Sequence, residues 1–319
     1  MIKLNMSDVI SVLNMCKPYL IAIAVILVVG IVAAAMCKKM ENPKRKLVRG
    51  NAILAMILGV VIVANLICTG PMSTLLTLST QAAETVSDET TEQSNEDCRT
   101  IAAEGTVLLE NDGVLPLKDT KNINVFGWAS VNPIYGGSGA GALNDLYDRV
   151  TMLEGLEDAG FKLNSELTDM YTNYGKERAD YGSDWSLPEV PAENYSDELI
   201  ENAKEFSDTA IVTIARWGGE GSDLPTDMSS VSYTNNSDSY NDFEAGQHYL
   251  ELSQTEKNMI NLVCENFEHV ILVYDGLSTF ELGFVEDYPQ IEGVLWCAGP
   301  GQTGFDSLGK IISGEVNPS

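Results

Sequence analysis

Two glycine-rich segments carry the residues whose types and spacing could do chemistry. The first, WASVNPIYGGSGAG, covers residues 128–141, and the second, RWGGEGSD, covers residues 216–223. In the second, Glu220 stands between two glycines, with Trp217 and Asp223 close to it in sequence. A carboxyl beside an indole ring can act as a general acid, and such a pair also suits a sugar, which stacks on the ring and bonds through its hydroxyls. On spacing alone, a solvated turn glutamate is the simpler interpretation.

The first segment favours a neutral, hydroxyl-rich ligand over a nucleotide. Its small residues let the backbone approach a ligand closely, and they follow a tyrosine: Tyr135, Gly136, Gly137, Ser138 and Gly139. A phosphate-binding loop has its glycines directly at the turn from strand to helix, and a P-loop adds a lysine. Here the glycines come late and no such lysine follows. We therefore expect no nucleotide cofactor.

The cysteines and histidines predict no further chemistry. Three cysteines lie in or beside long apolar runs, and the spacing of the other three, Cys98, Cys264 and Cys297, fits no metal site. Buried free thiols are expected, with no metal and no cofactor. His248 in a loop and His269 at the start of a strand are interpreted as structural residues.

Alternating strands and helices must position the two glycine-rich segments. Apolar runs rich in β-branched residues predict buried strands at 123–127, 210–215, 270–274 and 293–297. Amphipathic segments predict helices at 98–110, 148–159, 196–206, 255–267 and 302–312. This alternation predicts an α/β fold with a mainly parallel sheet covered on both faces. Ligands of such sheets bind beyond the carboxyl ends of the strands, where both glycine-rich segments begin.

Two long apolar runs near the N-terminus predict a membrane anchor. They cover Tyr19–Met36 and Ala52–Cys68, each near the short limit for crossing a bilayer. The link Cys37–Gly50 carries six basic residues against Glu41, which predicts a cytoplasmic link and an extracellular remainder. A cleaved signal peptide is the alternative, but it explains only one of the two runs.

The charge differs sharply along the chain. The 319 residues carry a net charge of −27, yet residues 1–70 hold eight basic and two acidic side chains, a net of +6. The rest holds 11 basic and 44 acidic residues, a net of −33, which excludes nucleic acid as a partner. Residues 71–95 are rich in Ser, Thr and Glu and are expected to be a flexible linker. We therefore expect an anchor at 1–70, a linker at 71–95 and a globular domain at 96–319.

Read in order, the segments of residues 96–319 carry a family resemblance. AEGTVLLENDGVLPL (103–117) and INVFG are followed by YGGSGAG, LEGLEDAG, IARWGGEGSD, LSQTEKNMI, VILVYDG, TFELGF, GVLWCAGPGQTG and ISGEVNPS. This ordered set resembles the second domain of glycoside hydrolase family 3, the β-glucosidase family. The resemblance implies a six-stranded α/β sandwich and retaining hydrolysis of β-linked sugars.

The resemblance also implies roles for particular residues. Glu220 corresponds to the acid/base glutamate that the family often carries in a Gly-Glu-Gly turn, and it is the expected catalytic residue. The residues expected to line the substrate site are Trp217, Asp223, Tyr135, Gly136, Gly137 and Ser138. Asp275 stands where many relatives carry Asn, a difference expected to alter only local hydrogen bonding.

The family's nucleophile is not expected in this chain. It is an aspartate in a Ser-Asp-Trp motif at a strand end of a (β/α)8 barrel. Ser183-Asp184-Trp185 matches in letters, but the preceding residues 176–182 are polar and two prolines follow, so Asp184 is rejected as the nucleophile. One loop is also not expected to supply both carboxyls, which must lie about 5 Å apart on opposite sides of the sugar.

The sequence therefore predicts an N-terminal part of a longer, membrane-anchored β-glucosidase-like protein with inverted domain order. The barrel domain is then the missing partner, and the chain is expected to be inactive alone. The main alternative is a non-catalytic module at the cell surface that binds a carbohydrate or another partner. A third interpretation is an unfolded fragment that exposes the apolar surface meant for the barrel.

Overall fold

The computed structural model describes residues 6–73, 76–77, 86–138, 142–143, 147–175, 185, 187–221, 223–231 and 243–319. The chain divides into two compact units, Met1–Val86 and Ser87–Ser319. Asp184, and Gly139 of the first glycine-rich segment, lie outside the described residues.

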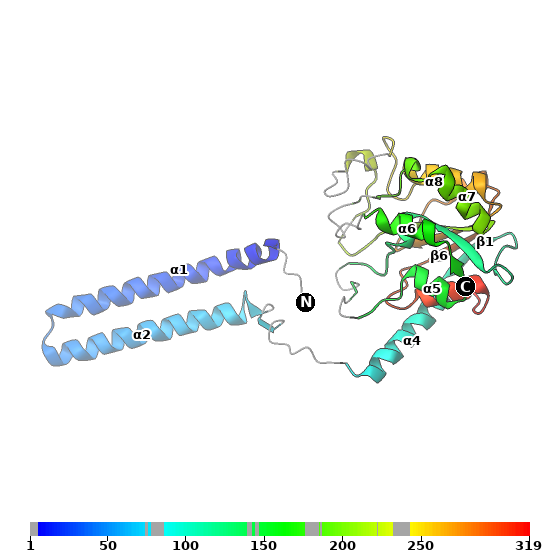
Figure 1. Ribbon diagram of the computed structural model, residues 1–319. Coiled ribbons are helices and arrows are strands. Elements are labelled where there is room, and N and C mark those ends of the chain that lie inside the picture. Colours follow the sequence, from blue (N-terminus) through cyan, green and yellow to red (C-terminus); the bar gives the residue numbers. More distant parts are fainter. Residues whose placement is uncertain are drawn as a thin grey trace. The chain divides into compact units, whose positions relative to one another are not determined.

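The first unit is a pair of antiparallel helices, α1 (Met6–Met36) and α2 (Asn42–Thr69), joined by the short 3-10 helix η1 (Cys37–Lys39) (Figure 1). Glycines let the two helices approach closely. A β-carbon on Gly30 would lie 2.6 Å from Sδ of Met56, and one on Gly59 would lie 3.2 Å from Ile26. By length and composition, Ile10–Met36 and Asn42–Thr69 are apolar enough to cross a membrane. They contain both runs predicted from the sequence.

The second unit begins with α4 (Asp88–Gly105), where the structure differs twice from the sequence-based expectation. Ser87 caps the helix by accepting a hydrogen bond from the Thr90 amide, so residues 88–95 of the expected linker are helical. The predicted helix at 98–110 is wrong at its end, because Val107–Asn111 forms strand β1. The apolar spacing of residues 107–110 also fits a helix. These residues pair instead with a strand at the edge of the sheet, where Val107 lies opposite Trp296.

The sheet has six strands in the order β1-β6-β5-β4-β2-β3. Besides β1, these are β2 (Asn122–Phe126), β3 (Lys162–Leu163), β4 (Thr209–Arg216), β5 (His269–Gly276) and β6 (Ile291–Cys297). All neighbouring strands are parallel except β1 and β6. The predicted six-stranded, mainly parallel sheet is therefore confirmed.

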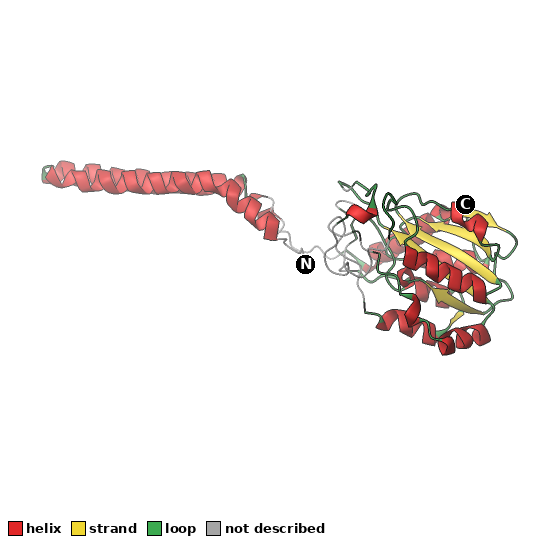
Figure 2. Cartoon of the chain, turned by 90° about the horizontal axis from the view of Figure 1, so that it is seen from above, coloured by secondary structure: helices red, strands yellow, loops and turns green. Residues whose placement is uncertain are grey.

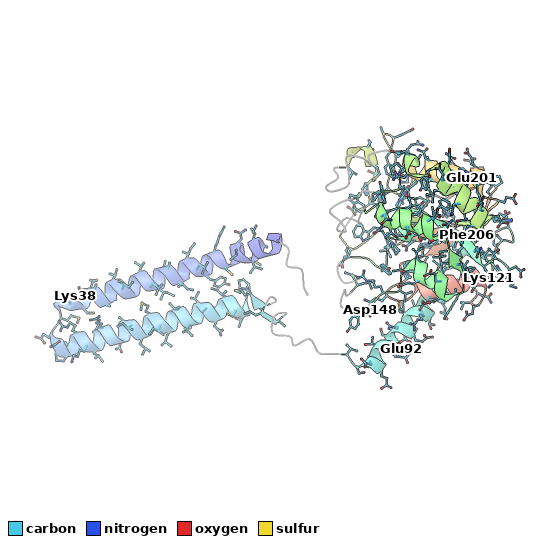
Figure 3. The ribbon with its side chains drawn as sticks, viewed as in Figure 1. Lys38, Glu92, Lys121, Asp148, Glu201 and Phe206 are labelled. Atoms are coloured by element: carbon cyan, nitrogen blue, oxygen red, sulfur yellow. The ribbon has the colours of Figure 1, made fainter. Side chains whose placement is uncertain are left out.

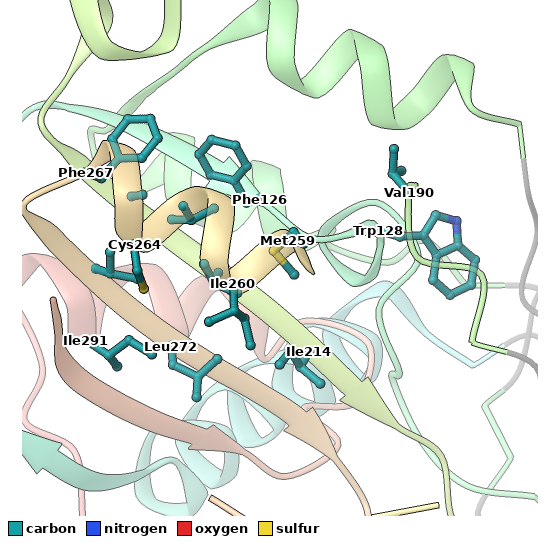
Figure 4. Packing of buried hydrophobic residues seen from close by; sticks show 14 of the residues in the cluster. Phe126, Trp128, Val190, Ile214, Met259, Ile260, Cys264, Phe267, Leu272 and Ile291 are labelled. Carbon is teal, nitrogen blue, oxygen red and sulfur yellow. The ribbon is translucent and has the colours of Figure 1, made fainter. Parts of the chain in front are cut away.

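Helices cover both faces of this sheet (Figure 2). Side chains alternate along β4 and β5: Val212 and Leu272 belong to the core under α6 (Ser165–Asn173), α7 (Asp197–Phe206) and α8 (Gln254–Asn266). Ile211 and Ile271 belong to the opposite core, under α5 (Met152–Asp158) and α9 (Phe305–Ser313). Figure 4 shows the first core, where Ile260 of α8 lies against the sheet. These two cores hold the strand ends that carry the site.

Candidate active site at the carboxyl edge of the sheet

The two glycine-rich segments meet because they follow neighbouring parallel strands, β2 and β4. The hydroxyl of Ser138 donates to the backbone carbonyl of Glu220 over 3.4 Å. A β-carbon on Gly219 would lie 2.4 Å from Oγ of Ser138, and one on Gly137 would lie 3.5 Å from the Gly218 carbonyl oxygen. The loops can pass this closely only because Gly219 has no side chain, whereas a β-carbon on Gly137 would make an ordinary van der Waals contact.

Glu220 is exposed at the tip of the second loop, followed by Gly221, which has a φ of +76°. Within the described ranges no cation forms an ion pair with the Glu220 carboxylate. Asp223, also exposed, comes three residues later. The loop therefore presents two carboxyls to solvent from the edge of the sheet.

Trp217 lies under the loop, not on its surface as expected for a residue that stacks on a sugar. Only 3% of its surface is exposed, and its amide donates to the hydroxyl of Tyr249 over 2.9 Å. Its ring lies 5.4 Å from that of half-buried Trp185, which in turn lies 5.0 Å from the ring of Tyr249. Trp185 is thus the more exposed member of this aromatic cluster. The sequence pattern does not predict that role, because Trp185 stands out there only as the last letter of a nucleophile-like motif.

Tyr135 anchors the first loop with its ring instead of presenting that ring to a ligand. The ring meets the edge of Phe305 at 5.4 Å, with the Arg149 guanidinium 5.2 Å away. The Tyr135 carbonyl accepts a hydrogen bond of 2.9 Å from the amide of Gly301. Half-buried Gly136, Gly137 and Ser138 follow directly, so the loop offers mainly backbone and one hydroxyl to a ligand.

Leu277 packs where three loops of this edge converge. β-Carbons on Gly137 and Gly218 would lie 3.6 and 3.5 Å from its side chain, and one on Gly299 would lie 2.3 Å from it. Gly137 follows β2, Gly218 follows β4 and Gly299 follows β6. One apolar side chain thus spaces three loops at this edge of the sheet, including the loop that carries Glu220.

A buried ion pair holds the base of the second loop. Arg216, the last residue of β4, donates two hydrogen bonds of 2.7 Å to the carboxylate of Glu256 and two of 2.6 Å to the carbonyls of Tyr249 and Glu251. Burial lowers the pKa of Arg216, but the carboxylate of Glu256 outweighs it and the pKa is raised. Forty residues separate the two partners in sequence, so no local pattern predicts the pair.

Two buried carboxyls hold the loops after β2. Asp275, fully buried at the end of β5, accepts a hydrogen bond from the amide of Ile134. Glu189 accepts from the amides of Trp128 and Val190, and burial raises its pKa to about 8. Both therefore act as supports beneath the surface that carries Glu220.

The two histidines form peripheral contacts with carboxylates. Nδ1 of His269 lies 2.7 Å from Glu292, and Nε2 of His248 lies 3.0 Å from Glu281. The hydrogen bond that the imidazole donates to the Glu292 carboxylate raises the pKa of His269. In the part of the chain that the structure describes, no group of three or more His, Cys, Asp or Glu side chains is placed to hold a metal ion.

A large cavity of about 360 Å³ lies between α4 and the loop that follows β6. Its lining is mostly apolar, and Asp97 is its single carboxyl among the described residues. Such a lining offers no second carboxyl from the described residues to pair with Asp97. We therefore place the candidate active site at the open surface around Glu220 and not in this cavity.

Comparison with known proteins gives this arrangement a family context. Residues 106–319 match the sequence profile of the glycosyl hydrolase family 3 C-terminal domain. The chain is similar to a β-glucosidase of Ruminococcus albus, with 30% identity over 224 residues, and to β-glucosidase A of Butyrivibrio fibrisolvens, with 28% over 226 residues. Each alignment covers 68% of this chain, but only 21% and 27% of those relatives. The chain thus spans about a quarter or less of their length.

Solved structures agree with the sequence comparison. The structure of β-glucosidase 3B from Thermotoga neapolitana in complex with α-D-glucose superposes with a TM-score of 0.57 at 26% identity, covering 72% of this chain and 30% of that one. A β-glucosidase from Paenibacillus barengoltzii gives the same TM-score and identity over 70% of this chain and 23% of that one.

Proposed function

The chain belongs to glycosyl hydrolase family 3, and from this membership we propose that its α/β domain supplies the acid/base glutamate of a retaining β-glycosidase. The observation that carries the proposal is the position of Glu220. This carboxyl is exposed on a glycine-bounded turn at the carboxyl edge of a parallel sheet, beside a second glycine-rich loop. The relatives it resembles are named β-glucosidases, so the proposed substrate is a β-linked glucoside or a related sugar.

In the proposed reaction Glu220 first acts as an acid and then as a base. Its protonated carboxyl gives a proton to the glycosidic oxygen while a carboxylate nucleophile attacks the anomeric carbon, so that the bond to the leaving alcohol breaks. The ionised Glu220 then takes a proton from a water molecule, which attacks the glycosyl–enzyme ester and releases the sugar.

The surrounding residues are proposed to line the leaving-group side of the sugar. Asp223 and Ser138 offer a carboxylate and a hydroxyl, and the backbone at Gly136 and Gly137 permits close approach. Trp217 is proposed to act through Trp185, whose ring lies 5.4 Å from its own and is more exposed. We propose that a (β/α)8 barrel supplies the nucleophile, because retaining hydrolysis needs a second carboxyl about 5 Å from the first.

We further propose that α1 and α2 form a membrane hairpin that keeps the α/β domain on the extracellular side. The length and apolar character of both helices support insertion, and the basic link between them supports the orientation. A polymeric or oligomeric glycoside would then be met outside the cell.

A chimera tests the catalytic role of Glu220. Residues 106–319 replace the aligned segment of the Ruminococcus albus β-glucosidase, and kcat and kcat/KM are measured with two aryl glucosides that differ in leaving-group acidity. We expect Glu220→Gln to lower kcat/KM by about 10²–10⁴-fold for the poor leaving group and much less for the good one, because kcat/KM reports the first step, in which only the poor leaving group needs a proton. For the good substrate kcat should fall, because the second step still needs the base. Azide, a nucleophile that needs no general base, should restore turnover of the good substrate.

Glu205→Gln, which changes an exposed carboxyl on α7, is the matched control and should leave both rates unchanged. An equal loss with both substrates, without azide rescue, would contradict the acid/base role. The unmodified full chain in detergent should release no nitrophenol from an aryl β-glucoside. Two results together would favour the non-catalytic binding module. The full chain would bind cello-oligosaccharides, and the active chimera would keep its activity when Glu220 is replaced by Gln.

A further inference from the structure

The turn between α1 and α2 gathers its cations beyond the ends of both helices' apolar runs. The contacts of Gly30 with Met56 and of Gly59 with Ile26 set the register of the antiparallel pair. This register places Met36, the last residue of α1, level with Gly50 of α2. Every basic residue from 38 to 49 therefore lies on the far side of that level, and Figure 3 shows Lys38 at this end of the hairpin.

Within the described part of the chain, these cations have no carboxylate partner. Lys38, Lys44, Lys46 and Arg49 are exposed, and Arg45 donates to the side chain of Asn42 over 2.6 Å. Among the residues placed by the structure, no carboxylate forms an ion pair with any of the five. We call the segment Lys38–Arg49 the basic turn.

Large apolar side chains are exposed among these cations. Met36 is 74% exposed, Met40 40% and Leu47 67%. A surface in contact with water alone gains nothing from such a mixture, whereas a membrane interface accepts both apolar side chains and cations. The composition of the basic turn therefore matches the boundary between hydrocarbon and headgroups.

The depth of the cations matches the phosphate layer of a bilayer. Arg49 and Lys44 are five residues apart on α2, which corresponds to about 7.5 Å along the helix axis. The headgroup layer on each side of the hydrocarbon is roughly 5–8 Å thick. With Gly50 at the hydrocarbon boundary, the cations from Arg49 to Lys44 span that layer.

We propose that the basic turn binds the phosphates of anionic phospholipids in the leaflet that surrounds it. The inference rests on the membrane insertion proposed above and goes beyond it, because orienting the hairpin requires only a charge imbalance and no lipid selectivity. The positive charge concentrated at the depth of the phosphates supplies the selectivity for anionic over zwitterionic lipid.

The test uses the full chain reconstituted in phosphatidylcholine vesicles that contain traces of spin-labelled lipid. Electron paramagnetic resonance measures the fraction of labelled lipid immobilised on the protein. We expect labelled phosphatidylglycerol to associate roughly fivefold or more strongly than labelled phosphatidylcholine, the factor that corresponds to about one basic residue at a membrane surface. The triple variant Lys44→Gln, Lys46→Gln, Arg49→Gln should bring the ratio close to one.

Two further variants separate charge from folding. Lys44→Arg with Lys46→Arg keeps the charge and should keep the preference. Lys204→Gln, Lys257→Gln, Lys310→Gln removes the same number of cations from the other unit and should also keep it. Because both leaflets have the same composition, a hairpin inserted in the opposite orientation contacts the same lipids. The measured fraction of immobilised lipid is then the same.

Flotation with the vesicles distinguishes the two proposals. A chain that does not float with them refutes membrane insertion. If the chain floats but binds both labelled lipids equally, or the triple Gln variant keeps the preference, the lipid inference alone is overturned. Displacement of labelled phosphatidylglycerol by millimolar glycerol phosphate would overturn it as well, because the site would then recognise free phosphate esters and not a bilayer.

Discussion

Replacing Glu189 by glutamine should change how the stability of the α/β domain depends on pH. Glu189 is 5% exposed, and its Oε1 accepts hydrogen bonds from the amides of Trp128 and Val190 over 3.1 and 2.8 Å, while its Oε2 lies 2.9 Å from the same Trp128 amide. A glutamine whose amide oxygen takes the place of Oε1 keeps a hydrogen bond to each donor and gives up the contact through Oε2. The substitution removes a titrating group and keeps the shape of the side chain.

The size of the effect follows from the raised pKa of Glu189. Burial moves this pKa from 4.5 to about 8, so the folded state binds the proton more tightly than the unfolded state. The stabilising contribution is fully present below pH 4.5 and is lost as the pH rises towards 8. At 1.36 kcal/mol per unit of pKa shift, the loss between pH 5 and pH 7 is about 2.5 kcal/mol. Above pH 8 the whole stabilising contribution of Glu189, about 5 kcal/mol, is lost.

Urea unfolding of the full chain in detergent measures this contribution. The chain has four tryptophans, Trp128, Trp185, Trp217 and Trp296, all in the second unit, so their fluorescence reports on the α/β domain alone. The two proteins should have similar unfolding free energies at pH 5. At pH 7 the unfolding free energy of the Glu189→Gln variant should exceed that of the unmodified chain by about 2.5 kcal/mol.

The comparison isolates Glu189 from other titrating groups. His269, whose pKa is raised by Glu292, also loses stabilising free energy as the pH rises, but equally in both proteins. Exposed Glu193→Gln should leave the pH profile unchanged. Parallel profiles for Glu189→Gln and the unmodified chain would refute the reasoning, because Glu189 would then titrate alike in the folded and unfolded states.

Three further substitutions test the supports beneath the candidate site, each by urea unfolding. Arg216→Met should cost about 3–5 kcal/mol because it leaves Glu256 charged and buried, whereas Arg216→Met with Glu256→Met should cost less; an equal or larger cost for the double variant would contradict this. Gly127→Ala should cost about 3 kcal/mol or more, since its β-carbon would lie 2.1 Å from the Thr213 carbonyl oxygen at a φ of +98°. Gly113→Ala, at a φ of +106° in open space, should cost only about 1–2 kcal/mol. Asp275→Ala should cost about 1–3 kcal/mol and speed hydrogen exchange at the Ile134 amide, and unchanged exchange would show that another group holds that amide.

The sequence predicts the central strands well because burial on both faces makes them continuous apolar runs. β4 and β5 match their predicted segments to within two residues. The edge strands are not predicted, because β3 has only two residues and β1 sits in a segment whose apolar spacing also fits a helix. Pairing with β6 decides the fate of β1, and that partner lies far along the chain.

The same distinction between local and distant information applies to the candidate site. The meeting of the two glycine-rich loops is predictable, because each follows a strand and the carboxyl ends of parallel strands share one edge. The supports of these loops are not predictable, because Arg216 with Glu256 and Leu277 with its three glycines join segments that are remote in sequence. Trp185 shows most clearly what the sequence does not predict. Its position follows from its contacts with Trp217 and Tyr249 and not from the Ser-Asp-Trp motif.

The exposure of Glu220 bears directly on the proposed mechanism. A carboxyl that must hold a proton near neutral pH normally works in apolar surroundings, as general acids of glycosidases do. On this chain the loops below Glu220 are fixed by Leu277 and by the buried Arg216–Glu256 pair, while the carboxyl itself faces solvent. The residues that the structure describes thus fix the position of the proposed acid but do not enclose it. A second surface that covers Glu220 would supply both the enclosure and the nucleophile, which is why the chimera, and not the chain alone, is the decisive assay.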